Sequence, residues 1–288
     1  MAIQGLVVAA YGKRYLVELP DCTRLSCVTR GKRTDLACGD IVQVSPTAPD
    51  EGVVEKHLPR KSLLHRSSAF KSKMLAANVT QAIIVLATQP SFYEALLSRC
   101  LVAAEAAGIR PVIVLNKCDL SDEQDAQSKL ETYRQLGYTV VKLAATQDIS
   151  PLLPYLHGQS SVLVGQSGMG KSTIINALVP QAAARTQAIS DVLDSGKHTT
   201  TAAQLYHLDA HSTLIDSPGL QEFGVHHLDQ TALELAFPEF KPYLGHCRFN
   251  NCRHLHEPDC AILSAVEASQ INAHRLQVYQ QLTQEIGD

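Results

Sequence analysis

The sequence predicts three units: an all-β barrel over residues 1–65, a doubly wound α/β sheet over residues 66–225, and a helical metal-binding region over residues 226–288. Short strand-like runs separated by Gly, Asp and Pro open the chain. Apolar strands then alternate with amphipathic helices, and three cysteines and a histidine lie close together near the end. With 288 residues, 45% of them hydrophobic, the chain can build more than one core.

The first unit contains four strand-like runs, at residues 5–10, 15–19, 24–28 and 40–44. Their length and rhythm fit an OB-fold, a small barrel that commonly binds oligonucleotides. An SH3-like barrel has the same periodicity and stays open as an alternative.

The charge of the chain is divided unevenly. Residues 1–75 carry twelve Lys and Arg against seven Asp and Glu, whereas the rest carries thirteen against twenty-one. One stretch has only basic charges: Lys56, Arg60, Lys61, Arg66, Lys71 and Lys73. Such a run is either a solvated face or a contact for the phosphate backbone of nucleic acid.

From about residue 76 the pattern changes to alternating strands and helices. Strands are predicted over residues 79–87, 110–115 and 138–143. The helix between the first two spans residues 92–107 and ends at Gly108. The next helix opens with a capping box at residues 121–124 and ends near Gly137. Strands that alternate with helices indicate a parallel sheet.

A phosphate-binding loop follows the apolar run at residues 161–164 and precedes the helical run at residues 173–178. Its glycines let backbone N–H groups surround phosphates, Lys171 reaches the β- and γ-phosphates, and Ser172 ligates Mg²⁺. The candidate nucleotide-binding residues of this loop are Gly165, Gln166, Ser167, Gly168, Met169, Gly170, Lys171, Ser172 and Thr173.

A base-reading element, Asn116-Lys117-Cys118-Asp119, directly follows a predicted strand. Asp119 can accept from the N1–H and the exocyclic amine of guanine, a donor pair that adenine lacks, while Asn116 and Lys117 brace the loop. The pattern therefore favours GTP over ATP.

A third element, Asp216-Ser217-Pro218-Gly219, follows the run at residues 212–215. It offers Asp216 to Mg²⁺ and the Gly219 amide to the γ-phosphate. In an ordinary GTPase the phosphate loop comes first and the base-reading element near the end, but here that order is rotated. Because a nucleotide site is assembled in space, the rotation leaves the chemistry intact. We therefore predict a circularly permuted P-loop GTPase.

The last unit contains Cys247-x4-Cys252-x-His254-x5-Cys260, a closed Cys₃His set that suits one structural Zn²⁺. His246 and His256 are near enough in the sequence to compete with His254. Ser264 is predicted to cap the helices that run towards Ile286.

The whole chain resembles the RsgA (YjeQ) family of ribosome small subunit-dependent GTPases. The permuted motif order and the Cys-x4-Cys-x-His-x5-Cys spacing carry the resemblance. It implies binding to the 30S subunit and its 16S rRNA late in maturation. It also implies GTP hydrolysis stimulated by that subunit, followed by release.

The resemblance also implies roles for two loops. Residues 143–148 resemble the guanine-capping loop without its usual serine, and Ala144 or Ala145 still offers a backbone N–H to the guanine oxygen. Residues 196–201 resemble switch I, where Thr199 or Thr200 would ligate Mg²⁺ and His198 would approach the attacking water. His198 is the preferred candidate because Leu220 occupies the position where many GTPases carry glutamine; Gln221 is the weaker one.

No apolar run approaches the ~18 residues of a membrane span, and the N-terminus lacks the pattern of a secretory signal. We expect a cytoplasmic monomer with GTP or GDP as its small-molecule ligand. Two other functions stay open: a signalling or transport switch whose barrel binds protein, and an ATP-dependent nucleic-acid enzyme. The base-reading element argues against the second.

Overall fold

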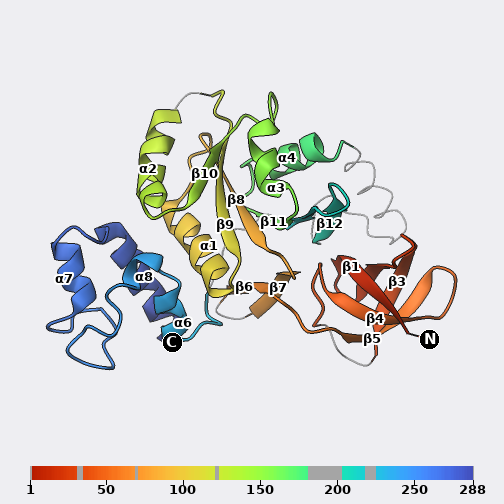
Figure 1. Ribbon diagram of the computed structural model, residues 1–288, viewed down its shortest axis with the longest axis horizontal. Coiled ribbons are helices and arrows are strands. Elements are labelled where there is room, and N and C mark those ends of the chain that lie inside the picture. Colours follow the sequence, from red (N-terminus) through yellow and green to blue (C-terminus); the bar gives the residue numbers. More distant parts are fainter. Residues whose placement is uncertain are drawn as a thin grey trace.

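The computed structural model describes residues 2–30, 35–68, 71–120, 123–180, 203–217 and 225–287. Figure 1 shows an elongated molecule with the β-barrel at one end, a layered α/β unit in the middle and a cluster of helices at the other end. The three predicted kinds of unit are therefore present in the predicted order.

The N-terminal unit is a closed five-stranded barrel. Its strands are β1 (Ile3–Tyr11), β2 (Arg14–Glu18), β3 (Arg24–Thr29), β4 (Ile41–Pro46) and β5 (Glu51–His57). They pair in the order β1-β2-β3-β5-β4, and β4 returns to β1 to close the barrel. Alternate residues point inward, among them Val7, Tyr15 and Val17. The prediction of an OB-fold barrel is confirmed.

A two-stranded hairpin, β6 (Leu63–Ser68) and β7 (Lys71–Ala77), follows the barrel and contains much of the basic stretch. Arg60 does not extend into solvent: its Nε lies 2.6 Å from Oδ1 of Asp40, whose side chain is fully buried. Since an unpaired buried carboxylate is costly, this member of the stretch stabilises the barrel.

The middle unit is a sheet in the order β10-β9-β8-β11-β13-β12. The bounds are β8 (Gln81–Ala87), β9 (Arg110–Asn116), β10 (Thr139–Lys142), β11 (Ser160–Val164), β12 (Gln204–His207) and β13 (Thr213–Asp216). All neighbours are parallel except β12, which runs antiparallel to β13. Strands that are buried on both faces explain why β8 and β9 are continuous apolar runs.

Helices cover both faces of this sheet. On one face, α1 (Glu94–Ala106) and α2 (Glu123–Gln135) share a buried cluster with Ile84 and Ile113. On the other face, η1 (Ser150–Leu152), α3 (Leu153–Leu156) and α4 (Lys171–Leu178) pack with Ile83 and Val112. Adjacent residues of one strand thus enter opposite cores, which the pleat requires.

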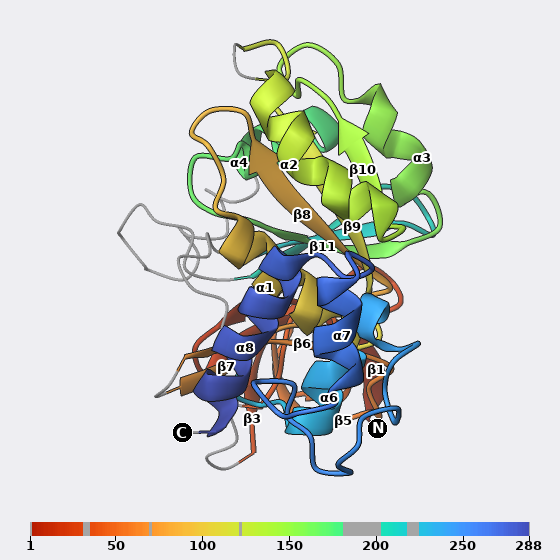
Figure 2. The ribbon, with the colours of Figure 1, turned by 90° about the vertical axis from the view of Figure 1, so that its left-hand side faces the viewer.

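The C-terminal unit contains α6 (Gln230–Leu235), η2 (Pro238–Phe240), α7 (Ala261–Glu267) and α8 (Ala273–Gly287). Figures 1 and 2 show α6 and α8 against α1. The prediction that Ser264 caps a helix is wrong, because α7 begins after Cys260 and Ser264 lies inside it. Cys260 directly precedes α7, and its sulfur lies with the ligand atoms of Cys247 and Cys252, so the helix begins where the ligand group ends.

Two arginine contacts join this unit to the α/β unit, one with a tyrosine ring of α2 and the other an ion pair with α1. Arg275, 1% exposed, donates from Nε to Oε1 of Glu239 at 2.6 Å. Its guanidinium also lies 4.5 Å from the ring centroid of Phe237 and 5.9 Å from that of Tyr133 on α2. Arg99 of α1 forms a second ion pair, with Glu285 of α8. None of the described helices combines the length and the apolar character needed to cross a membrane.

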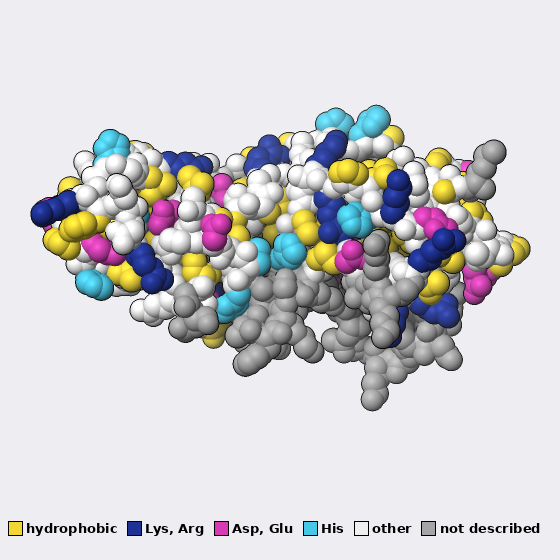
Figure 3. Space-filling view, turned by 90° about the horizontal axis from the view of Figure 1, so that it is seen from below, with side chains coloured by type: hydrophobic (Ala, Val, Ile, Leu, Met, Phe, Trp, Pro, Cys, Tyr) yellow, Lys and Arg dark blue, Asp and Glu magenta, His cyan; other side chains and the backbone are white. Residues whose placement is uncertain are grey.

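Histidine side chains gather near the middle of the face in Figure 3. The rings of His65 on β6 and His227 lie against each other at a tilt of 33°, with centroids 4.9 Å apart. Burial lowers the pKa of both rings; the charge of Arg60 lowers that of His65 further, and His65 and His226 lower that of His227. The folded protein therefore binds these protons less readily than the unfolded chain does.

We expect the contribution of these histidines to the free energy of unfolding to be fully present above about pH 6.5, the ordinary histidine pKa. It should be lost as the pH falls from there towards the lowered pKa values of the folded state. The double variant His65→Gln/His227→Gln should weaken this loss, as measured by urea unfolding between pH 7.5 and 5. The exposed His211→Gln serves as the control. An identical pH dependence in the double variant and the parent protein would contradict this expectation.

Candidate nucleotide site and metal cluster

The predicted nucleotide-binding residues meet at one edge of the sheet. Gly165 follows β11, Asn116 ends β9, Asp216 ends β13, and Ala144 lies two residues beyond β10. Because these strands are parallel, their carboxyl ends lie at the same edge, where open α/β sheets bind ligands. Motifs far apart in the sequence are therefore neighbours in space.

The phosphate loop requires glycine at two positions. Gly165 has φ 151°, and a Cβ there would lie 2.4 Å from the carbonyl oxygen of Val85. Gly170 has φ 93°, and a Cβ there would lie 2.2 Å from Nδ2 of Asn116. The loop thus bends tightly against β8 and the base-reading element before α4 begins at Lys171.

Lys171 lies inside this loop. Its side-chain amine donates to the carbonyl oxygens of Gly165 at 2.6 Å and Gln166 at 2.9 Å, and the residue is only 9% exposed. Burial lowers the pKa of Lys171, and the nearby carboxylate of Asp216 opposes that effect. The amine is thus fixed where phosphate oxygens would replace the carbonyl groups as acceptors.

Asn116 connects three loops through one side chain. Nδ2 donates to the Met169 carbonyl oxygen at 3.0 Å, and Oδ1 accepts from the backbone N–H of Ala145 at 3.0 Å. The side chain is 2% exposed, so both bonds are shielded from water. The Ala145 N–H is therefore engaged with Asn116, while Ala144 and Thr146 lie on either side of it.

Lys117 braces the base-reading element against two other segments. It has a left-handed backbone, with φ 61°. Its amine donates to the carbonyl oxygens of Gln89 at 2.7 Å and Gly168 at 2.8 Å. The hydroxyl of Thr88 donates to the Lys117 carbonyl oxygen at 2.8 Å. Sequence reasoning missed Thr88 and Gln89, although both directly follow the carboxyl end of β8.

Asp119 and Cys118 complete this element. Oδ2 of Asp119 lies 3.5 Å from Nε2 of Gln147 in the predicted guanine-capping loop. The thiol of Cys118 donates to the carbonyl oxygen of Leu115 at 3.3 Å. The backbone N–H of Cys118 donates to the carbonyl oxygen of Leu143 at 3.2 Å. Asp119 and the capping loop thus face each other, as one base held between them would require.

Asp216 lies between the sheet and the phosphate loop. Burial raises the pKa of its carboxyl group to about 6, and the Lys171 charge lowers it in part. A divalent cation at this point would favour the ionised carboxylate.

Two serines directly follow the charged residues of this predicted metal position, Asp216 and Lys171. The Ser217 hydroxyl donates to the Leu163 carbonyl oxygen at 2.6 Å and anchors the turn after Asp216. Ser172 presents its side chain at the exposed start of α4. These residues fit a Mg²⁺ ion bound with a nucleotide.

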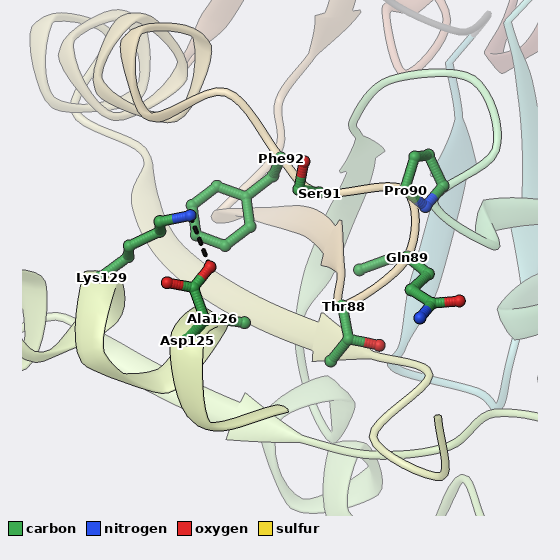
Figure 4. Close-up of a pocket in the computed structure, with 9 residues that line it drawn as sticks. Thr88, Gln89, Pro90, Ser91, Phe92, Asp125, Ala126 and Lys129 are labelled. Carbon is green, nitrogen blue, oxygen red and sulfur yellow. Dashed lines mark hydrogen bonds and ion pairs between the residues drawn. The ribbon is translucent and has the colours of Figure 1, made fainter. Parts of the chain in front are cut away.

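A pocket of about 640 Å³ adjoins the brace formed by Lys117. In Figure 4, Thr88, Gln89, Pro90, Ser91 and Phe92 form one side and α2 the other, where Lys129 and Asp125 pair at 2.6 Å. The pocket is distinct from the phosphate loop. It shares Gln89 with the Lys117 brace, because the carbonyl oxygen of this residue accepts from the Lys117 amine.

Several predicted residues lie outside the described ranges. They are His198, Thr199, Thr200, Gly219, Leu220 and Gln221. Their roles stay predictions.

The four predicted metal ligands converge. The ligand atoms of Cys247, Cys252, His254 and Cys260 all lie within 4.8 Å of one another. Nδ1 of His254 is 3.6, 3.5 and 3.3 Å from the sulfurs of Cys247, Cys252 and Cys260, and the sulfurs of Cys247 and Cys260 are 3.8 Å apart. Tetrahedral Zn²⁺ with ordinary bond lengths would separate two sulfurs by about 3.8 Å and a sulfur from a nitrogen by about 3.6 Å. The residues therefore fit one zinc ion.

The surroundings of the cluster favour the same ion. Nε2 of His254 faces Oε1 of Glu234 at 3.8 Å, so the ring can present Nδ1 to a metal. Glu257 accepts backbone N–H bonds from Arg253, Leu255 and His256 and holds the loop in shape. Burial raises the pKa of Cys252 to about 12, so the thiolate form needs the positive charge of an ion. Neither His246 nor His256 belongs to the group of converging ligand atoms found among the described residues.

A phosphate loop, a base-reading element and Asp216 meet at one sheet edge in rotated chain order, and this arrangement defines a circularly permuted P-loop GTPase. The model of the RsgA GTPase family matches residues 57–226. The chain belongs to the RsgA GTPase family.

Curated relatives match nearly the whole chain. The "Small ribosomal subunit biogenesis GTPase RsgA" of Nitrosospira multiformis is 52% identical over 97% of this chain and 90% of its own. The protein of the same name from Ralstonia pickettii is 53% identical over 98% of this chain and 92% of its own.

Two solved structures resemble the fold along its length. YjeQ from Thermotoga maritima has a TM-score of 0.76 at 31% identity and covers 99% of both chains. YloQ, described as a circularly permuted GTPase, has a TM-score of 0.71 at 27% identity and covers 100% of this chain and 96% of its own. The predictions of family, fold class and GTPase activity are thereby confirmed.

Proposed function

We propose that this GTPase acts in the late maturation of the small ribosomal subunit, where it hydrolyses GTP to GDP and phosphate with stimulation by that subunit. The observation that carries the proposal is the meeting of the phosphate loop and the base-reading element at one sheet edge, in a chain about half identical to relatives named for small ribosomal subunit biogenesis. We further propose that the protein is cytoplasmic and monomeric.

In the proposed complex the phosphate loop, residues 165–173, surrounds the phosphates, and the Lys171 amine turns from the loop carbonyls to the β- and γ-phosphates. Ser172, Asp216 and Thr200 hold Mg²⁺, and the Gly219 amide meets the γ-phosphate. What supports this is the buried amine of Lys171, whose charge interacts with the half-buried carboxylate of Asp216.

The base-reading element, residues 116–119, selects guanine through Asp119. The fixed position of Asn116 and Lys117, each bonded to the phosphate loop, supports this assignment. A backbone N–H of the loop that contains Ala144 and Ala145 donates to the guanine oxygen. Because Ala145 already donates to Asn116, Ala144 or the adjacent Thr146 would supply that N–H.

The proposed catalytic group is His198, which orients the attacking water, because the apolar side chain of Leu220 cannot do so. The proposed zinc ion is bound by Cys247, Cys252, His254 and Cys260 and has a structural role, since four protein ligands leave no open position.

The proposed partner is the 30S subunit with its 16S rRNA, contacted through the barrel and the basic hairpin. Arg60 is excluded from that surface because it pairs with buried Asp40. The remaining basic residues, rather than Arg60, would approach phosphates.

The test is GTP turnover with and without purified 30S subunits. We expect slow turnover alone and at least about 10-fold stimulation by 30S subunits, because the usual water-orienting glutamine is replaced by leucine. The 50S subunits should not stimulate, and ATP should neither compete with GTP nor be hydrolysed. Equal turnover with and without 30S subunits would favour a switch whose barrel binds protein.

A further inference from the structure

One row of residues crosses the sheet from the barrel to the nucleotide site. Ala9 of β1 lies opposite Gln204 of β12, and Gln204 lies opposite Asp216 of β13. Because neighbouring strands are about 4.8 Å apart, the backbone of Asp216 is only about 10 Å from that of the barrel strand. The barrel and the α/β unit therefore share one continuous sheet of eleven strands.

The barrel holds β12 near both ends. The backbone N–H of Ala10 donates to the carbonyl oxygen of Ala203, the residue before β12, at 3.4 Å. At the last residue of β12, Nε2 of His207 lies 2.6 Å from Oε1 of Glu18 on β2. The second oxygen of Glu18 accepts from Nε of Arg24 at 2.9 Å, and the Glu18 side chain is only 12% exposed. A strand of four residues is thus attached to the barrel at each end.

Apolar contacts join the same elements. Val8 and Cys38 of the barrel unit belong to one buried cluster with Leu205 of β12 and Ile215 of β13. Gly39 lies so close that a Cβ there would be 2.2 Å from the Ala77 carbonyl oxygen and 3.2 Å from Cδ1 of Ile215. Close-packed surfaces of this kind transmit a displacement rather than absorb it.

We propose that the barrel positions the carboxylate of Asp216 for its metal ion, with Glu18 as a positioning residue that acts through His207 and β12. The inference rests on the proposed assignment of Asp216 to Mg²⁺. If the affinity of a partner for the barrel depends on the position of β12, binding of that partner shifts β12. The shift then changes the metal affinity of the site at Asp216 on the adjacent strand β13. Binding at the barrel thereby affects the metal site of the nucleotide.

The experiment measures how Mg²⁺ slows the release of a fluorescent GDP analogue from the full-length protein. We expect Glu18→Ala to raise the Mg²⁺ concentration that gives half-maximal slowing of release at least about 3-fold. A change of this size corresponds to the loss of one partly exposed hydrogen bond between charged groups. Glu18→Gln keeps an acceptor for His207 and should restore much of the parent value. Glu18→Ala/His207→Ala should shift no further than Glu18→Ala alone, because both changes remove one interaction.

The matched control is Glu55→Ala, which removes a barrel carboxylate paired with Arg30 at 3.1 Å. Glu55 lies on β5, which pairs with β3 and β4 rather than with β12. A merely structural role for Glu18 would lower the melting temperature but leave the Mg²⁺ dependence unchanged. An unchanged Mg²⁺ dependence in Glu18→Ala, or an equal shift in Glu55→Ala, would overturn the inference.

Asp216→Asn separates this inference from the assignment on which it rests. If Asp216→Asn leaves the Mg²⁺ dependence unchanged, the metal assignment fails and the inference fails with it. If Asp216→Asn shifts the dependence and Glu18→Ala does not, only the coupling through the barrel is wrong.

Discussion

Replacing Lys171 by alanine is expected to lower kcat/KM for GTP at least about 100-fold, the usual cost of losing one charged donor to the transition state. The Lys171 amine is the positive group buried beside the phosphate loop, 2.6 Å from the Gly165 carbonyl oxygen. Its charge also favours the ionised form of Asp216, whose pKa burial raises to about 6. The substitution therefore removes phosphate binding and weakens the metal site together.

Steady-state hydrolysis in the presence of 30S subunits checks this result. The exposed Lys241→Ala in the C-terminal unit is the matched control and should retain parental turnover. Thermal unfolding should change little in Lys171→Ala, since the amine donates only to loop carbonyl groups. Turnover within about 3-fold of the parent would exclude Lys171 from the phosphate site.

Cys260→Ser is expected to release zinc and to destabilise the C-terminal unit by several kcal/mol, because metal-binding energy there is also folding energy. Cys260 is buried, and its sulfur lies 3.3 Å from Nδ1 of His254 and 3.8 Å from the sulfur of Cys247. The same residue precedes α7, so loss of the ion should also disturb the start of that helix. We expect the melting temperature to fall by on the order of 10 °C.

Elemental analysis should find about one zinc per parent chain and little in Cys260→Ser. His256→Ala should retain the ion, because the imidazole of His254 rather than that of His256 belongs to the ligand group. Zinc that is absent from the parent protein purified without chelator, or lost in His256→Ala, would contradict the assignment.

Local motifs carried much of the prediction. The phosphate loop and the base-reading element are short, contiguous signals, because each is one strand end followed by one turn, and the structure brings both to the same sheet edge. The helix start at Ser264 was wrong for the opposite reason. A capping pattern is local, whereas the position of Cys260 depends on ligands thirteen and eight residues earlier in the chain, at Cys247 and Cys252.

The basic stretch shows where composition loses information. Arg60 has the same charge as its neighbours in the sequence, but it pairs with Asp40, twenty residues earlier, inside the barrel. Whether a charge faces solvent or a buried carboxylate depends on strand pairing. The sequence alone offered a solvated face or a phosphate contact for this stretch, and Arg60 is in neither position.

The amino-acid sequence by itself determined the chemistry of this protein: a phosphate loop, a guanine-reading loop and a Cys₃His set, each recognisable from residues near one another in the chain. Only the tertiary structure decided that Asn116 joins the phosphate loop to Ala145 and that Ala9, Gln204 and Asp216 form one row across a shared sheet. Pairing between residues 9 and 204 leaves no periodic trace in the sequence. It depends on the packing of two whole units, which no local pattern encodes.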